Sequence, residues 1–118
     1  MPYKLVWILK DANQKKAEFP PQIKLVEFLS EESFDELASA KLWIDNTRKF
    51  PYWKMGLLKK DNQKYIQTWH GSLGLKKIEA AIDNENPDWR KWAKVDSRNI
   101  DYILSNSSYD YRLFKLYI

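Results

Sequence analysis

The sequence contains no cysteine, only one histidine, only three glycines and no long apolar run. Without cysteine, the chain has neither disulfides nor thiolate metal sites, which fits a reducing compartment. With one histidine, only carboxylates remain as metal ligands, so we expect no metal site and no cofactor. No apolar stretch approaches the roughly 20 residues of a membrane-spanning helix. The apolar start at 3–9 is too short for a signal peptide, because Lys10 and Asp11 follow it at once.

The composition is that of a folded domain with a mild positive charge. Of the 118 residues, 44% are hydrophobic and 15% are aromatic, which indicates a core rather than a disordered chain. Twenty basic residues against 16 acidic ones give a net charge of +4. This balance suits a nucleic acid, an anionic membrane surface or a phosphorylated substrate, and composition does not decide between them.

Apolar segments alternate with helix signals along the chain. Segments with the composition of strands are 3–9, 23–29, 42–46, 64–69 and 99–105. Helices are expected from Ser33 to about Lys41, opened by a capping box to Glu36, from Ser72 to about Asn84, from Trp89 to Lys94 after an Asp88 cap, and from Ser107 to Tyr117. The alternation predicts one α/β domain over residues 1–118, with a Rossmann-like open, mostly parallel sheet of about five strands flanked by helices.

A long connection is expected between the third and fourth strands, from Thr47 to Asn62. It is rich in basic and aromatic residues. Connections of this length tend to be functional, and this one is the best local candidate for contact with lipid head groups or a phosphate-bearing acceptor. An irregular cover over the edge of the sheet is the alternative.

The segment 64–79 contains the single histidine, His70, and reads as a strand that turns sharply into a helix. Gly71 permits the turn, and Ser72 is a good N-cap. Lys76 and Lys77 fall near the helix start, where cations oppose the helix dipole, so an anionic partner is worth considering. On the other hand, a lone histidine is more often structural or exposed, and a lysine pair is usually a solvated helix face.

Small polar residues end three of the expected strands: Asp45-Asn46-Thr47, Thr68-Trp69-His70 and Ser105-Asn106-Ser107. Ligands of open parallel sheets bind outside the carboxyl ends of the strands. If these three strands are parallel, their ends therefore converge on one crevice.

The run 65–78, Tyr-Ile-Gln-Thr-Trp-His-Gly-Ser-Leu-Gly-Leu-Lys-Lys-Ile, resembles the signature of the CDP-glycerol glycerophosphotransferase family. These are the polyol-phosphate transferases and polymerases of teichoic acid and capsule synthesis. The family typically shows a Thr-Trp-His-Gly-Thr-Pro-Leu-Lys-like segment. Here Ser72 replaces the threonine, the proline is missing and Leu73-Gly74 lengthens the run, which resembles a capsule-type branch. Segments 40–48 and 100–107 also match, so the likeness spans nearly the whole chain.

The resemblance implies the N-terminal, acceptor-side half of a two-domain transferase of the glycosyltransferase B type. The donor-binding half would be absent from these residues, and the isolated chain would be inactive. The implied reaction is attack of an acceptor hydroxyl on the phosphate of a CDP-polyol, which releases CMP, with His70 as general base. The substrate-binding residues would be Gly71, Ser72, Lys76, Lys77, Asn46, Arg48 and Asn106.

The resemblance also implies the partners. These are the CDP-polyol donor and a polyol-phosphate or glycan-lipid acceptor, but no nucleic acid. A cytoplasmic protein, peripheral on the inner face of the cell membrane, is expected. Two alternatives stay open: a stand-alone α/β module that binds anionic lipid, glycan phosphate or nucleic acid without catalysis, and a fragment of another glycosyltransferase.

Overall fold

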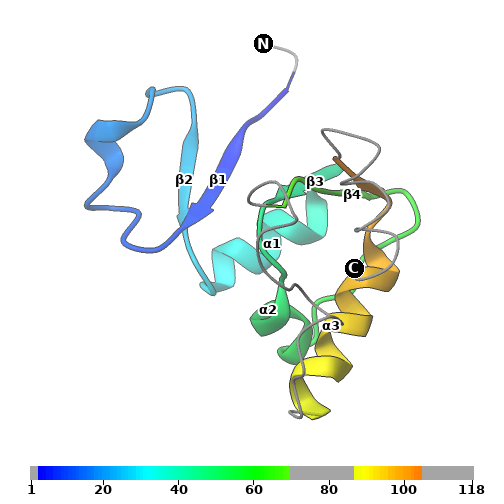
Figure 1. The fold of residues 1–118 in the computed structure, drawn as a ribbon. Helices are drawn as coiled ribbons and strands as arrows, with labels where there is room; N and C mark the ends of the chain where they lie inside the picture. The colour runs from blue at the N-terminus through cyan, green and yellow to red at the C-terminus, as the bar shows by residue number, and fades with distance from the viewer. Residues whose placement is uncertain (1–2, 70–86, 105–118) are drawn as a thin grey trace, which may run out of the picture. The chain divides into compact units, whose positions relative to one another are not determined.

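The computed structural model describes residues 3–69 and 87–104 of a chain that divides into two compact units, Met1–Ala40 and Lys41–Ile118. The first unit contains β1 (Val6–Leu9), the 3-10 helix η1 (Lys16–Glu18), β2 (Lys24–Glu27) and α1 (Glu31–Ser39). The second contains β3 (Leu42–Asp45), α2 (Phe50–Lys54), β4 (Lys64–Gln67), α3 (Pro87–Asn99) and β5 (Tyr102–Ile103) (Figure 1). The helices predicted at 72–84 and after Ser107 lie outside the described residues.

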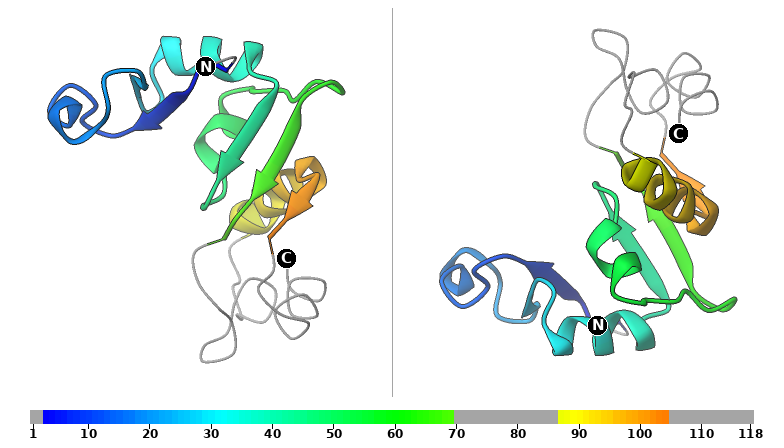
Figure 2. Two further views of the ribbon diagram at one scale, coloured as in Figure 1. Left: turned by 90° about the horizontal axis from the view of Figure 1, so that it is seen from above. Right: turned by 90° about the horizontal axis from the view of Figure 1, so that it is seen from below.

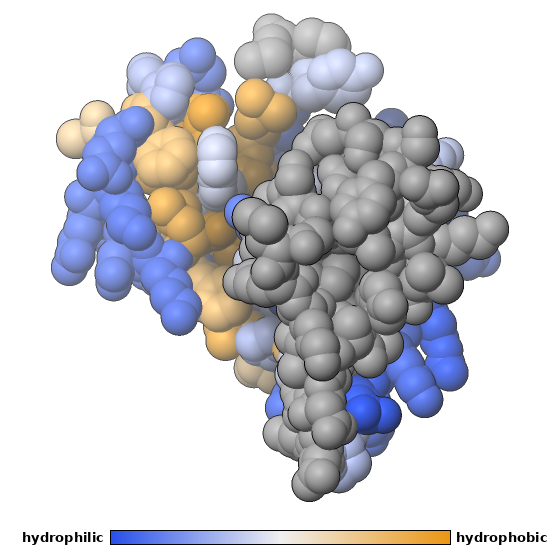
Figure 3. Space-filling model, in the orientation of Figure 1, coloured by the Kyte–Doolittle hydropathy of each residue, from blue (hydrophilic) through white to orange (hydrophobic). Residues whose placement is uncertain are grey.

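In the first unit, β1 and β2 form a two-stranded parallel sheet that pairs Val6 with Lys24 and Leu9 with Glu27. The ring of Trp7 packs edge-on against that of Phe19, with 5.1 Å between centroids. Hydrophobic side chains, bordered by hydrophilic ones, are visible over this sheet in Figure 3. The strands pair in parallel, as the alternation of strands and helices predicted.

The N-cap of helix α1 lies three residues before Ser33, the predicted N-cap, so the predicted capping box is wrong. The N-cap is Ser30, whose hydroxyl oxygen accepts the Ser33 N–H at 3.1 Å. Ser33 is buried in the first turn, and its own hydroxyl donates to the Ser30 carbonyl at 2.6 Å. Leu29, two residues after the end of β2, has φ 62° and turns the chain there. The acidic Glu31 then lies in the first turn of α1, where the positive end of the helix dipole stabilises it. The early turn therefore moves the cap upstream.

In the second unit, β3, β4 and β5 lie side by side in that order, and all three run parallel (Figure 2). Trp43 pairs with Tyr65 and Asp45 with Gln67 across β3 and β4. Ile66 pairs with Tyr102 across β4 and β5. Helices α2 and α3 cover the same face of this sheet and pack against each other.

The core of the second unit lies between this sheet face and the helices. The ring of Trp43 lies 6.1 Å from the rings of both Trp53 and Tyr65, and all three side chains are buried. Since side chains alternate along a strand, Leu42 and Ile44 point to the opposite face, where they are exposed. The aromatic residues on β3 and β4 thus fix which face the helices cover.

The predicted fold class, parallel β-structure flanked by helices, is confirmed. The described strands, however, hydrogen-bond in a two-stranded and a three-stranded sheet, whereas one sheet was expected. Helix α3 is longer than the predicted 89–94, and it begins at Pro87, which loses no helical hydrogen bond at that position. Asp88 therefore lies in the first turn rather than at the cap.

The connection 47–62 is not irregular throughout, because it contains α2. Pro51 stands in the first turn of this helix, where its missing N–H is not needed. Tyr52 and Trp53 are buried, as is Leu57 after the helix. Much of the aromatic content that suggested a contact surface therefore belongs to the core.

Candidate functional site

The carboxyl ends of β3, β4 and β5 meet at one edge of the three-stranded sheet. The Thr68 N–H donates to the Asp45 carbonyl at 2.8 Å, which extends the β3–β4 pairing beyond the strands. The Leu104 N–H likewise donates to the Gln67 carbonyl at 3.0 Å. The parallel arrangement that a convergence of strand ends requires is therefore present. Edges of this kind are where open α/β sheets bind ligands.

Two of the predicted site residues, Asn46 and Arg48, belong to the described part of the chain, and both follow β3. The other predicted site residues lie outside it: His70, Gly71, Ser72, Lys76, Lys77 and Asn106. Their roles stay predictions. Trp69, however, is described, and it directly precedes His70 in the sequence.

The turn after β3 is held by the carboxylate of Asp45. Its Oδ1 accepts the N–H groups of Asn46 at 2.8 Å and Thr47 at 3.1 Å, an arrangement that aspartate commonly forms at turns. Its Oδ2 accepts the ammonium of Lys49 at 2.7 Å, and that lysine is buried. The turn leaves Asn46 exposed at the carboxyl end of β3, a position compatible with its predicted contact with substrate.

The side chain of Arg48 points into the second unit and hydrogen-bonds to α3. Its side chain is 6% exposed. Its Nη1 donates to Asp96 Oδ2 at 3.0 Å, Ser97 Oγ at 2.9 Å and the Ala93 carbonyl at 3.2 Å. A direct contact with substrate stays a prediction.

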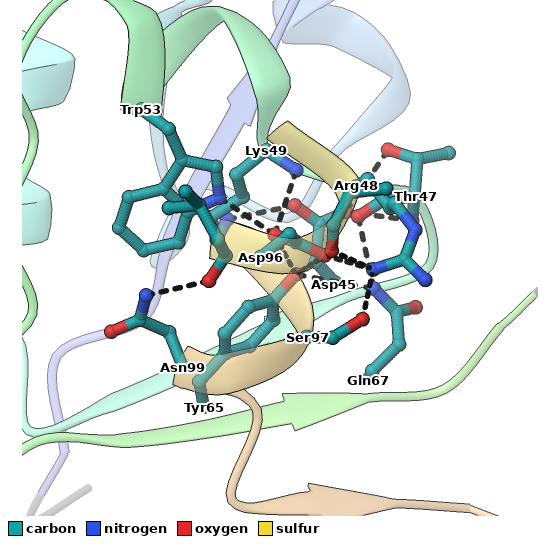
Figure 4. A network of polar contacts seen from close by, with 12 residues as sticks. Asp45, Thr47, Arg48, Lys49, Trp53, Tyr65, Gln67, Asp96, Ser97 and Asn99 are labelled. Atoms are coloured by element: carbon teal, nitrogen blue, oxygen red, sulfur yellow. Dashed lines mark hydrogen bonds and ion pairs between the residues drawn. The ribbon is translucent and has the colours of Figure 1, made fainter. Parts of the chain in front are cut away.

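Asp96 is the centre of a buried polar network (Figure 4). Besides Arg48, its carboxylate accepts the Lys49 N–H at 3.2 Å, Trp53 Nε1–H at 2.7 Å and the Tyr65 hydroxyl at 3.0 Å. Burial, and then the charge of the nearby carboxylates, raises the pKa of Tyr65 far above its usual range, so its hydroxyl stays a donor. The network joins α3 to β4, to α2 and to the turn after β3.

Sequence reasoning missed Asp96, although a signal for it exists. Asp96 lies three residues after the buried Ala93 and seven after Trp89, so it occupies the inner face of the helix. A carboxylate at a core-facing helical position needs a buried cation or several donors. Arg48 and Lys49 follow a strand end and are candidates for that partner.

Gln67, the last residue of β4, links the turn after β3 to the residues that follow β4. Its Nε2 donates to the Thr47 carbonyl at 3.0 Å and to the Tyr65 hydroxyl at 3.2 Å. Its Oε1 accepts the Trp69 N–H at 2.9 Å. Trp69 has a left-handed backbone, with φ 59°, and its ring lies 5.8 Å from the Arg48 guanidinium.

Two further findings concern the described residues only. Residues 3–69 and 87–104 contain no group of three or more His, Cys, Asp or Glu side chains that could hold a metal ion. Among the helices described, none has the length and apolar character to span a bilayer.

The sequence is similar to enzymes of teichoic acid synthesis. It is 29% identical over 118 residues to a teichoic acid poly(glycerol phosphate) polymerase of Staphylococcus epidermidis, an alignment that covers 96% of this chain and 16% of that protein. It is 34% identical over 88 residues to a teichoic acid glycerol-phosphate transferase of Staphylococcus aureus, covering 70% of this chain and 21% of the relative.

The fold is similar to that of the wall teichoic acid polymerase TagF. A histidine variant of TagF matches with a TM-score of 0.74 and 26% identity, over 97% of this chain and 28% of TagF. A variant soaked with CDPG matches with a TM-score of 0.74 and 25% identity, over the same shares. The chain thus spans less than a third of each of these proteins.

The relatives and the fold agree with the match to a family of enzymes. The family model described as CDP-glycerol:poly(glycerophosphate) glycerophosphotransferase matches residues 1–117, nearly the whole sequence. The chain belongs to the CDP-glycerol:poly(glycerophosphate) glycerophosphotransferase family.

Proposed function

We propose that this chain is the acceptor-side part of an enzyme that transfers glycerol phosphate from CDP-glycerol to a hydroxyl acceptor in teichoic acid or capsular polysaccharide synthesis. The observation that carries the proposal is the family match over residues 1–117. The TagF variant soaked with CDPG supports the identity of the donor. We place donor binding outside these 118 residues, since the matched relatives are several times longer.

The reaction is the displacement of CMP from the donor phosphate. An acceptor oxygen forms a bond to phosphorus, the bond from phosphorus to the CMP oxygen breaks, and CMP leaves with the electron pair. His70 takes the hydroxyl proton, a role suited to a group that titrates near neutral pH. The amides of Gly71 and Ser72, with Lys76 or Lys77, hold the phosphate oxygens and neutralise their charge.

The acceptor lies, in this proposal, along the carboxyl ends of the three parallel strands. Asn46, exposed after β3, and Asn106 bind it through their amide groups. Arg48 contributes by holding the turn after β3 through Asp96, and its direct contact with the acceptor remains a prediction. Positioning supplies a large share of the rate in phosphoryl transfer, so a rigid sheet edge suits this chemistry.

The proposal is tested in a chimera in which residues 1–118 replace the matched segment of the Staphylococcus epidermidis polymerase. We expect the chimera to release CMP from CDP-glycerol when a glycerol-phosphate acceptor is present, because the relative supplies the parts that this chain lacks. Chromatography of the nucleotides measures the release. The polymerase with the segment deleted is the control. A folded chimera without CMP release would contradict the proposal and favour the binding-module alternative.

We propose in addition a peripheral position at the inner face of the cell membrane. Met55 and Leu58, between α2 and β4, are 62% and 80% exposed, and the exposed Lys54 and Lys60 flank them in the sequence. Apolar side chains beside cations are typical of surfaces that bind anionic lipid.

Sedimentation with vesicles tests this position. We expect the chain to sediment with vesicles that contain phosphatidylglycerol, and the double substitution Met55→Ser and Leu58→Ser to weaken binding about fivefold or more, because it removes two apolar contacts. Tyr3→Ser, at another exposed residue, is the matched control. Equal binding of all three proteins, or none to anionic vesicles, would contradict the proposal.

A further inference from the structure

Gln67, the last residue of β4, uses its side-chain amide to bind the backbone of two separate segments. Its side chain is completely buried, and both the nitrogen and the oxygen of its amide form hydrogen bonds. One end of the amide binds the backbone of Thr47, and the other binds the backbone of Trp69. The side chain therefore connects the loop after β3 with the chain leaving β4 (Figure 4).

The residue at the far end of this link is strained. Trp69 has φ 59°, a left-handed backbone conformation that is unfavourable for a bulky residue. Such strain persists only where the surroundings hold it, and it clusters at functional sites. The contacts that hold Trp69 include three near its backbone and ring: its N–H donates to Gln67 Oε1, the Arg48 guanidinium lies over its ring, and Thr68 Oγ1 donates to its carbonyl at 3.1 Å.

The groups behind these contacts are buried and hydrogen-bonded to one another. Gln67 Nε2 also donates to the hydroxyl of Tyr65, which is bound to Asp96, and Asp96 holds Arg48. Two of the side chains that contact Trp69 are thus tied to the same buried carboxylate, Arg48 directly and Gln67 through Tyr65. These contacts act on the backbone of Trp69. The backbone angles of a residue set the direction of the peptide that follows it.

We propose that Gln67 and Arg48 are positioning residues for His70: by holding Trp69 in its left-handed conformation, they set the direction in which the chain enters the residue that follows. The proposal rests on the function proposed above, in which His70 is the general base. A base misplaced by about 1 Å is expected to lose much of its effect on the rate.

The first test compares two substitutions of Trp69 in the chimera. Trp69→Gly and Trp69→Pro both remove the ring, but glycine adopts a positive φ and keeps the N–H, whereas proline has φ near −65° and no N–H. We expect kcat of the proline variant to be at least about tenfold below that of the glycine variant, with KM for CDP-glycerol changed less than about twofold in both. If only the ring matters, the two variants have equal kcat, and the proposal is overturned.

Gln67→Met is the second substitution, because methionine keeps the volume of glutamine without its hydrogen bonds. We expect kcat to fall about tenfold at a temperature where the variant is folded. Ser30→Ala is the control for lost stability: it removes the N-cap of α1, which lowers stability, and leaves residues 67–69 unchanged. Equal losses of kcat in Gln67→Met and Ser30→Ala would also overturn the proposal.

A measurement on the 118-residue chain separates this proposal from the proposed function. The chain has one histidine, so its imidazole gives a single, unambiguous set of NMR signals. We expect Gln67→Met to change the amide–Hα coupling constant of Trp69 and to shift the His70 ring signals, while Ser30→Ala changes neither. This result with an inactive chimera would refute the function and keep the positioning role. Unchanged signals in Gln67→Met would refute the positioning role even if the chimera is active.

Discussion

Replacing Asp96 by asparagine is expected to lower the free energy of unfolding by about 3–5 kcal/mol, the usual loss when one partner of a buried ion pair is removed. The carboxylate accepts hydrogen bonds from four groups: the Arg48 guanidinium, the Lys49 N–H, the Trp53 indole N–H and the Tyr65 hydroxyl. An asparagine turns an NH₂ group toward at least one of these donors. It also leaves the Arg48 charge buried without a counter-charge.

Urea unfolding followed by far-UV circular dichroism measures this loss. Asp88→Asn is the matched control, because it makes the same change on the same helix at an exposed residue, whose carboxylate pairs with Lys54 across the surface and accepts the Trp92 indole N–H. We expect Asp88→Asn to lower stability by no more than about 1 kcal/mol. Similar losses in the two variants would show that the Asp96 network contributes little. If the Asp96→Asn variant is already unfolded without urea while the Asp88→Asn variant is folded, the result agrees with the expectation.

Replacing His70 by alanine is expected to lower kcat for CMP release by the chimera about 10²–10⁴-fold, the usual contribution of a positioned general base. The KM for CDP-glycerol should change little, because donor binding is placed outside this chain. Lys94→Gln, at an exposed residue of α3, is the control and should keep the parental kcat.

The pH profile adds a second readout for His70. Only the neutral imidazole accepts a proton, so kcat/KM of the parent chimera should fall as the pH drops below about 6.5. That fall should be absent from the residual activity of His70→Ala. If His70→Ala keeps more than a tenth of the parental kcat, His70 is not the general base.

Much of the fold could be predicted from the sequence because strands and their polar ends leave local signals. Apolar runs placed all five described strands, and their alternation with helices predicted parallel pairing. The N-cap of α1 was misplaced because Ser30 and Ser33 both suit the role, and the deciding feature is the positive φ of Leu29. The split into two sheets could not be predicted, because strand composition does not say which strands pair.

The candidate site was less accessible to sequence reasoning. Asn46 could be placed at a strand end because the polar residue directly follows an apolar run. The burial of Arg48 could not be predicted, because it depends on Asp96, which lies 48 residues later in the chain. The predicted helix 89–94 stopped short because Asp96 interrupts the apolar pattern, while its side chain is satisfied by donors from other elements.

The buried carboxylate also bears on how this sheet edge could be redesigned. A protein engineer who wished to transplant the turn after β3, with its exposed Asn46, into another α/β scaffold would move Arg48 with it. The guanidinium would then lose the acceptors that α3 provides in Asp96, Ser97 and the Ala93 carbonyl. The smallest portable unit is therefore the turn together with the middle of α3 and Tyr65, three segments that are distant in sequence and must be exchanged as a set.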